Sequence, residues 1–220
     1  MLRRAIAAFL AAGLWVHGPS HAHGVSSNPA SSRVGRGLVD FHRLSLAAGS
    51  LPREERPGFV NNSINRCVGY AADDLQWGEV DRWQTPAETL ARQLGDCEDF
   101  AIAKFFLLHE CGAPCACARL LYAVHTPPDT PGLAQAHIVL IGAADSDHSD
   151  DPLVFDNLNP LLLPVSRRTD LSPVLSFDAS ALWRGVSGER VGNAAMLLRP
   201  WRELLLRWRR QQEADRLGQS

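Results

Sequence analysis

One stretch of the chain constrains the fold more than any other, because it predicts a helix that is apolar on almost every side. The sequence GDCEDF at residues 95–100 leads directly into AIAKFFLLHE. Asp96 stands where an N-cap residue would, Asp99 follows three residues later, and a Gly-Ala-Pro sequence at 112–114 stops the helix. A helix without a broad polar face must be enclosed by the rest of its domain. We therefore expect it to lie at the centre of the fold.

The segments around this helix change type along the chain. Before it, helices are predicted near residues 37–49 and 57–70, and a third begins at Pro86 behind a capping box formed by Thr85 and Glu88. After it, short apolar runs between turn-forming links predict strands at residues 115–125, 135–142 and 152–158. Helices followed by strands indicate an α+β fold, and 220 residues suit one domain.

The first residues have the pattern of an export signal. Two arginines precede an apolar stretch at residues 5–16, and Ser20 and Ala22 supply the small residues that signal peptidase accepts. Residues 1–22 are therefore predicted to be a cleaved signal peptide, which makes the mature protein exported and soluble. An uncleaved membrane anchor is the alternative, although a membrane-spanning helix needs about 20 apolar residues.

The mature chain is predicted to begin with a flexible segment, residues 23–37, which is rich in Ser, Gly and Asn. A single domain is expected over residues 38–220, ending in an amphipathic helix whose apolar side carries Trp201, Leu204, Leu205 and Trp208. This side is expected to pack on the domain, with binding to a membrane surface as the alternative. The net charge of −2 gives no general attraction to nucleic acid or to anionic membranes.

The five cysteines leave several arrangements open in an exported protein. Four of them could form two disulfides in any of three pairings, with Cys97 as the odd thiol, or they could remain reduced. A metal site made of the last three is a further alternative, but it lacks a second paired knuckle. These four cysteines are Cys67, Cys111, Cys115 and Cys117.

Cys97 is the candidate nucleophile, because it falls at the first position of the apolar helix. Unpaired N–H groups and the positive end of the helix dipole lower a thiol pKa there and can bind an oxyanion. An inert buried cysteine is the competing interpretation. If the strands near residues 136–141 and 153–157 form an antiparallel hairpin centred near residue 147, His137 lies opposite or diagonal to Asp156.

These three residues together predict a thiol-nucleophile triad. Cys97 would attack a carbonyl carbon, His137 would take the thiol proton and pass it to the leaving amine, and Asp156 would orient the imidazole. The Cys97 backbone N–H would contribute to the oxyanion hole. A structural histidine and a turn-initiating aspartate are the competing interpretations of His137 and Asp156.

The order of motifs resembles a known family. It runs from VNNSINRCVGYAADDLQWGEVDRWQTPAETLARQLGDCEDFAIAKFFLL through AHIVL and PLVFDNL to RRTDLSPVLSFDASALW, over roughly residues 55–185. This order is similar to that of the bacterial transglutaminase-like cysteine proteinases, the LapG-type periplasmic proteases. The resemblance implies a papain-like, transglutaminase-core fold, and it places the family's catalytic Cys, His and Asp on Cys97, His137 and Asp156.

The resemblance also implies a cofactor, a substrate and a regulator. Members of this family need calcium, and Asp96 and Glu98 occupy the positions of its ligands beside the nucleophile, although acidic residues also suit a first helical turn without any metal. The implied substrate is the N-terminal region of a large cell-surface adhesin, whose release disperses biofilm. The implied inhibitor is an inner-membrane cyclic di-GMP receptor that binds the protease in the periplasm.

Two other functions remain open from the sequence. Transglutaminase or amidase chemistry could use the same core, because the geometry of a triad does not fix the acyl acceptor. A non-catalytic periplasmic binding module that keeps the fold is the alternative from a different class.

Overall fold

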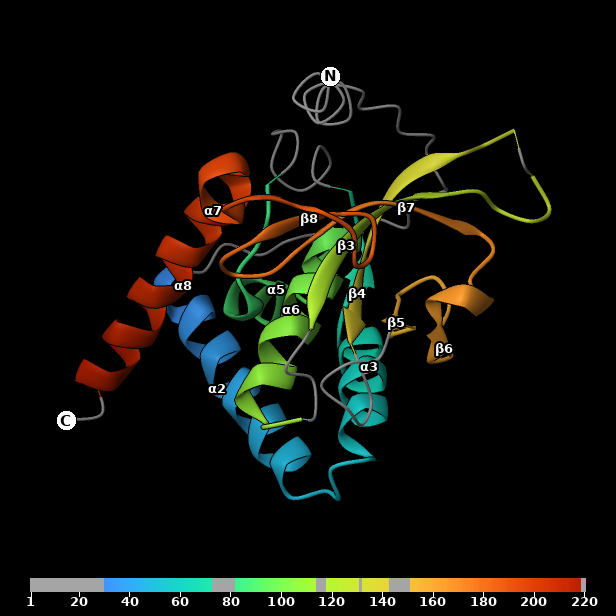
Figure 1. The fold of residues 1–220 in the computed structure, drawn as a ribbon. Helices are drawn as coiled ribbons and strands as arrows, with labels where there is room; N and C mark the ends of the chain where they lie inside the picture. The colour runs from blue at the N-terminus through green and yellow to red at the C-terminus, as the bar shows by residue number, and fades with distance from the viewer. Residues whose placement is uncertain (1–29, 73–81, 114–117, 131, 143–150, 219–220) are drawn as a thin grey trace.

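The fold joins a group of helices to one antiparallel sheet (Figure 1). The computed structural model describes residues 30–72, 82–113, 118–130, 132–142 and 151–218. The helices are α2 (Ala30–Gly49), α3 (Arg56–Cys67), α5 (Pro86–Arg92), α6 (Cys97–Glu110), α7 (Ala194–Leu197) and α8 (Arg199–Gly218), with a 3-10 turn at Val165–Arg167. The strands are β1 (Gly69–Tyr70), β2 (Leu94–Gly95), β3 (Arg119–His125), β4 (Gln135–Gly142), β5 (Leu153–Phe155), β6 (Leu163–Pro164), β7 (Leu171–Phe177), β8 (Leu182–Arg184) and β9 (Arg190–Gly192).

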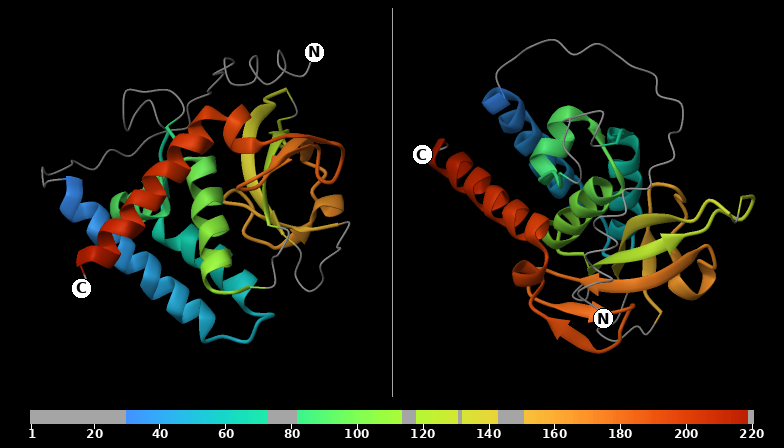
Figure 2. Two further views of the ribbon diagram at one scale, coloured as in Figure 1. Left: turned by 60° about the vertical axis from the view of Figure 1, so that its left-hand side comes forward. Right: turned by 90° about the horizontal axis from the view of Figure 1, so that it is seen from above.

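The larger sheet has the strand order β6-β5-β4-β3-β7-β8-β9, and each neighbouring pair is antiparallel. The predicted hairpin is present: β4 pairs with β5, with Leu140 opposite Phe155. The short strands β1 and β2 form a separate parallel pair. The expected α+β class is therefore confirmed, with the helices gathered to one side of the sheet (Figure 2).

Helix α6 lies at the centre, as its apolar sequence predicted. It contacts the sheet through β3 and β4 and is contacted by α2, α3 and α5. Eleven of its fourteen residues are buried. They include Phe100, Phe105 and its one lysine, Lys104. The other face of the sheet has a smaller core of its own, which explains why strands β3 and β4 are apolar on both sides. That core contains Leu121, Ala123, Val139, Ile141, Val154 and Leu171.

Helix α2 begins at Ala30, eight residues before Leu38, where ordered structure was expected to start. The helix packs on α5, and this contact includes Gly37. Gly37 lies against the backbone of Ala87, so closely that an added Cβ atom would stand 1.9 Å from the Ala87 carbonyl oxygen. The small residues that suggested flexibility thus allow two helices to approach each other. Part of the segment predicted to be flexible, residues 23–37, is therefore helical.

Several other predictions fall partly or wholly beyond the described residues. The predicted signal peptide, residues 1–22, lies outside them, as do Cys115 and Cys117. Cys67 and Cys111 are free thiols. The alternative in which these two cysteines and Cys115 and Cys117 form two disulfides is therefore not present. Among the helices that the structure describes, none is both long and apolar enough to span a bilayer.

Candidate active site

The N-terminus of α6 is fixed by a buried carboxylate that the sequence suggested only as a helix cap. Asp99 accepts hydrogen bonds from the backbone N and the side-chain Nε2 of Gln84, at 2.7 and 2.5 Å, and a longer one from the Asp96 backbone N at 3.4 Å. Gly95 is required beside it, because a Cβ there would lie 2.7 Å from the Asp99 Cβ. The segment before α5 is thereby tied to the turn that carries Cys97.

Cys97 is buried at this helix terminus, with 8% of its surface exposed. Its Sγ donates a hydrogen bond to Glu98 Oε2 at 3.1 Å. Burial, the charge of Glu98 and the charge of Asp96 raise the pKa of the thiol well above its usual range, while a hydrogen bond from the Ile138 backbone lowers it. Burial and the two carboxylates therefore outweigh the favourable helix position, and their net effect disfavours the thiolate.

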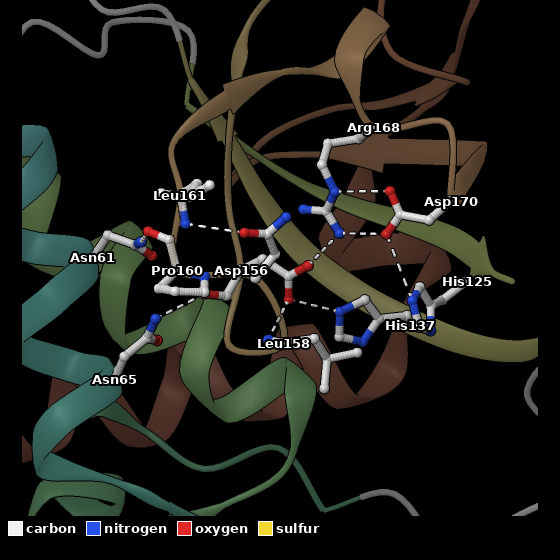
Figure 3. Close-up of polar contacts among 11 residues, drawn as sticks. Asn61, Asn65, His125, His137, Asp156, Leu158, Pro160, Leu161, Arg168 and Asp170 are labelled. Carbon is white, nitrogen blue, oxygen red and sulfur yellow. Dashed lines mark hydrogen bonds and ion pairs between the residues drawn. The ribbon is translucent and has the colours of Figure 1, made fainter. Parts of the chain in front are cut away.

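His137 and Asp156 meet beside this terminus, as the hairpin predicted. His137 Nε2 lies 2.8 Å from Asp156 Oδ1, and both side chains are almost fully buried (Figure 3). Because Nε2 faces the carboxylate, the other ring nitrogen, Nδ1, is left for a different partner. His137 directly precedes Ile138, whose backbone contacts the Cys97 sulfur. The sheet and α6 thus bring the three predicted residues to one place.

The Asp156 carboxylate is held by several donors. Oδ1 also accepts a hydrogen bond from the Leu158 backbone N at 3.0 Å, and Oδ2 accepts one from Arg168 Nη2 at 2.7 Å. Burial opposes ionisation, but the bonds from His137, Leu158 and Arg168 outweigh it and hold the Asp156 pKa well below its usual range. The side chain is therefore an ionised carboxylate at neutral pH.

Helix α3 positions the loop that begins at Asp156. Asn65 Nδ2 donates to the Asp156 backbone oxygen at 2.8 Å, and Asn61 Nδ2 donates to the Pro160 backbone oxygen at 3.0 Å. The two asparagines are one helical turn apart and reach the same loop (Figure 3). The sequence analysis did not identify either residue. The one signal for them was their spacing of four residues on a predicted helix, which places both on the same face.

Arg168 and Asp170 were also missed. Arg168 is 2% exposed, and Asp170 binds it through two bonds, from Nε to Oδ1 at 2.9 Å and from Nη2 to Oδ2 at 2.7 Å. Asp170 Oδ2 also lies 3.5 Å from His125 Nε2. The sequence RRTD gave no sign of this role, because two adjacent arginines before a strand usually indicate a solvated turn.

The residues suggested for calcium binding have suitable chemistry but form only part of a site. Asp96 is fully buried, Glu98 is 5% exposed, and both place negative charge beside the Cys97 sulfur. Hard carboxylate oxygens of this kind suit Ca²⁺. Within the described ranges, however, no group of three or more His, Cys, Asp or Glu residues is arranged to hold a metal ion. Since Ca²⁺ takes about six to eight oxygen ligands, Asp96 and Glu98 supply a fragment of a calcium site.

Known proteins share this sequence and this architecture. A model of the bacterial transglutaminase-like cysteine proteinase family matches residues 55–172. The structure of Legionella pneumophila LapG is 31% identical, with a TM-score of 0.65 over 80% of this chain and 89% of the Legionella chain. An EGTA-treated form of that protein has the same identity and coverage and a TM-score of 0.66.

A calcium-bound form of the Legionella protein is equally similar, with 31% identity, a TM-score of 0.65, and coverage of 80% of this chain and 91% of the other. No curated protein matches the chain. The family model covers more than half of the sequence and the structural matches cover most of it, in an architecture of helices on an antiparallel sheet. The chain therefore belongs to the bacterial transglutaminase-like cysteine proteinases.

Proposed function

We propose that the protein is a calcium-dependent cysteine endopeptidase of the periplasm that cleaves the N-terminal region of a large cell-surface adhesin. One observation carries the catalytic part of this proposal. The buried pair of His137 Nε2 and Asp156 Oδ1, 2.8 Å apart, stands next to the helix terminus that bears Cys97. In a cysteine proteinase family, this arrangement supports a nucleophile, a base and an orienting carboxylate.

The first half of the reaction forms an acyl-enzyme. His137 Nδ1 takes the proton from the Cys97 thiol, and the sulfur attacks the carbonyl carbon of the scissile peptide bond. Asp156 accepts the hydrogen bond from Nε2 throughout, so that the positive imidazolium is stabilised and correctly oriented. The carbonyl oxygen becomes an oxyanion, which the Cys97 backbone N–H at the start of α6 can bind.

The second half restores the enzyme. The imidazolium gives its proton to the leaving amine as the carbon–nitrogen bond breaks, which leaves a thioester on Cys97. His137 then takes a proton from water, whose oxygen attacks the thioester and releases the new carboxylic acid. The proton returns to the sulfur, so the resting pair of thiol and imidazole is recovered.

Asp96 and Glu98 are the proposed calcium ligands of this chain. Bound Ca²⁺ would supply positive charge that offsets these two carboxylates, and it would thus remove the main electrostatic obstacle to the thiolate. The Legionella protein has been seen in a calcium-bound and in an EGTA-treated form, which supports this cofactor. The proposed ligands flank the nucleophile directly in sequence, so metal binding and reactivity would be coupled.

The biological setting is also part of the proposal. An adhesin substrate, control by an inner-membrane cyclic di-GMP receptor and location in the periplasm all follow from the family resemblance. The export pattern at residues 1–22 supports the location. The proposed consequence of cleavage is release of the adhesin and dispersal of biofilm.

Incubation with the N-terminal fragment of an adhesin from the same genome tests the activity. We expect mass spectrometry to find two cleavage products with calcium, and none with excess EGTA or with the Cys97→Ala variant. Cross-linked or deamidated glutamine in place of cleaved peptide would identify a transglutaminase or amidase instead. If Cys97→Ala still supports adhesin release in cells, the protein is a binding module.

A further inference from the structure

The side chains behind Asp156 form a chain of titratable groups that the reaction described above does not use; Arg168 is buried, and Asp170 and His125 are partly buried. It consists of Arg168, Asp170 and His125, which we call the Asp156 network (Figure 3). The Arg168 guanidinium connects two carboxylates, because Nη2 lies 2.7 Å from both Asp156 Oδ2 and Asp170 Oδ2. It therefore bridges the proposed orienting carboxylate and a second acid.

Arg168 determines how the Asp156 carboxylate can turn. It occupies Oδ2, which leaves Oδ1 for His137 and for the Leu158 backbone N. A carboxylate bound at both oxygens has a fixed plane, whereas one bound only at Oδ1 can rotate about its carbon–carbon bond. The orientation of the His137 ring depends on this plane, because Oδ1 is the acceptor for Nε2.

Asp170 determines how much negative charge remains available to His137. A lone arginine beside Asp156 would cancel the carboxylate and remove its attraction for an imidazolium. Asp170 instead neutralises the positive charge of Arg168, because it accepts two hydrogen bonds from the guanidinium. The charges of Asp156, Asp170 and Arg168 add to −1, which becomes zero when His137 holds a proton. The network is therefore balanced for the protonated histidine of the reaction.

His125 closes the network on the side of the sheet. It lies on β3, its ring centroid is 5.7 Å from that of His137, and burial followed by the proximity of His137 lowers its pKa. A neutral His125 can direct its Nε2–H group toward Asp170, 3.5 Å away, without adding positive charge beside His137. Among the described residues, Arg168 also acts electrostatically on His125, and Lys104 of α6 acts on Asp156.

We propose that Arg168 and Asp170 are positioning residues that act on His137 through Asp156. Arg168 fixes the plane of the carboxylate, and Asp170 neutralises Arg168 so that the charge of Asp156 stays available to the protonated imidazole. This inference rests on the proposed roles of Cys97, His137 and Asp156. It adds a second layer to that site, which neither the family resemblance nor the motif RRTD assigned.

The test uses the intact protein and needs no substrate. The rate of Cys97 alkylation by iodoacetamide, followed by peptide mass spectrometry at one fixed pH with calcium, reports transfer of the thiol proton to His137. We expect Arg168→Met and Asp170→Asn each to slow alkylation about tenfold, as is usual for outer partners of a reactive site. Arg207→Met is the matched control, because Arg207 pairs with Glu88 on α5 and does not contact the network.

The double variant separates positioning from a merely structural role. In Arg168→Met/Asp170→Asn the uncompensated positive charge is gone, so we expect alkylation no slower than in Asp170→Asn alone. Independent structural damage would multiply the two effects to about a hundredfold, which would overturn the proposal. Rates equal to the wild type in folded single variants would also overturn it. If Arg168→Met does not fold, Arg168→Lys replaces it, with an intermediate rate expected because a lysine cannot bind both acids as a fork.

Cleavage of the adhesin fragment is measured on the same variants. We expect kcat to fall in parallel with alkylation and KM to stay unchanged, because the network lies behind the catalytic residues. If alkylation responds as expected but the wild type cleaves no adhesin, the proposed substrate is wrong and the positioning role stands. If the wild type cleaves but the variants are unaffected in both assays, the positioning role is wrong and the function stands.

Discussion

The Cys97 thiol lies beside two buried carboxylates whose charge opposes the thiolate that a nucleophile requires. Glu98 acts on the thiol both through its charge and through the hydrogen bond from Sγ. The helix terminus alone cannot compensate, since burial raises the thiol pKa further. Reactivity at this residue should therefore depend on whatever positive charge these carboxylates can bind.

Glu98→Gln separates the effect of charge from the effect of the metal. In EGTA, we expect the variant to be alkylated at Cys97 about three- to tenfold faster than the wild type, because removing this charge lowers the thiol pKa. With calcium added, the wild type should become faster and the variant should not respond. Iodoacetamide kinetics at pH 8 give both values. Glu110→Gln, at the exposed far end of the same helix, should behave as the wild type, and a calcium response in Glu98→Gln would remove Glu98 from the ligands.

Lys104, like Cys97, is a buried residue whose charged form is disfavoured by burial. It is fully buried on α6, its Nζ has no hydrogen-bond partner among the described residues, and burial lowers its pKa to about 7 despite the attraction of Asp156. Below pH 7 the lysine is charged in both the folded and the unfolded protein, and folding must then bury that charge. Between pH 7 and its usual value of 10.5, only the unfolded protein binds the proton, so stability rises with pH.

Lys104→Met should therefore stabilise the protein most at low pH. We expect the free energy of unfolding to increase by about 2–5 kcal/mol at pH 6, because methionine fills the same space without a charge. The gain should shrink steadily between pH 7 and pH 10. Urea denaturation at three pH values measures it, and a gain that does not change with pH would show that burial does not lower the Lys104 pKa in the folded protein.

At the scale of elements, the packing of α2 on α5 depends on one glycine. Gly37 lies against Ala87, whereas Gly35, two residues earlier on the same helix, has nothing within 4 Å of an added Cβ. We expect Gly37→Ala to destabilise the protein by about 1–3 kcal/mol through overpacking. Gly35→Ala should stabilise it by up to about 1 kcal/mol through helix propensity. Thermal unfolding of both variants checks the pair, and an equal gain in both would show that the two helices do not touch at Gly37.

The same elements show what the sequence could predict and why. Helix α6 and strand β4 were predicted almost to the residue, because a long apolar helix and a strand between turn signals are both local patterns. Strands β8 and β9 were missed, because three-residue strands have too few positions for a pattern. β8 is held by pairing with β7, and β9 by pairing with β8. Distant contacts add to this, such as the Arg119 guanidinium 3.9 Å above the Trp183 ring.

The residues of the candidate site also divide into those that the sequence could identify and those that it could not. Cys97, His137 and Asp156 could be proposed because each has a distinct local position, at a helix start, a strand start and a strand end. Arg168 could not, because nothing in the sequence distinguishes it from the adjacent Arg167, which is exposed. Burial of one arginine and not the other is decided by the path of the chain from the 3-10 turn into β7. Only the three-dimensional structure contains that path.

At the scale of the whole molecule, α8 joins parts of the chain that are far apart in sequence. Trp201 is fully buried and its ring packs against aromatic rings from α6, from β7 and from the segment before α5. Arg207 donates to the Trp83 carbonyl and to Glu88, and Gln211 also donates to Glu88. The apolar side of this helix therefore faces the domain, which favours the packing interpretation over binding to a membrane surface.

A tryptophan near the middle of α8 tests whether this helix belongs to the cooperative unit. Trp208 is 5% exposed and lies edge-on to Phe41 of α2, with the ring centroids 5.1 Å apart. We expect Trp208→Ala to cost about 3–5 kcal/mol, the usual range for a buried aromatic residue. Unfolding in urea should remain a single transition, with the same midpoint by circular dichroism and by fluorescence of the remaining tryptophans.

The control is Leu206→Ala, two residues away on the exposed side of the same helix, which should change stability by less than about 0.5 kcal/mol. Neither variant nor the wild type should sediment with anionic phospholipid vesicles, because the apolar side is occupied by the domain. An early, separate loss of helical signal in Trp208→Ala would show that α8 unfolds independently. Vesicle binding by the wild type that Trp208→Ala abolishes would instead assign the apolar side of α8 to a membrane surface.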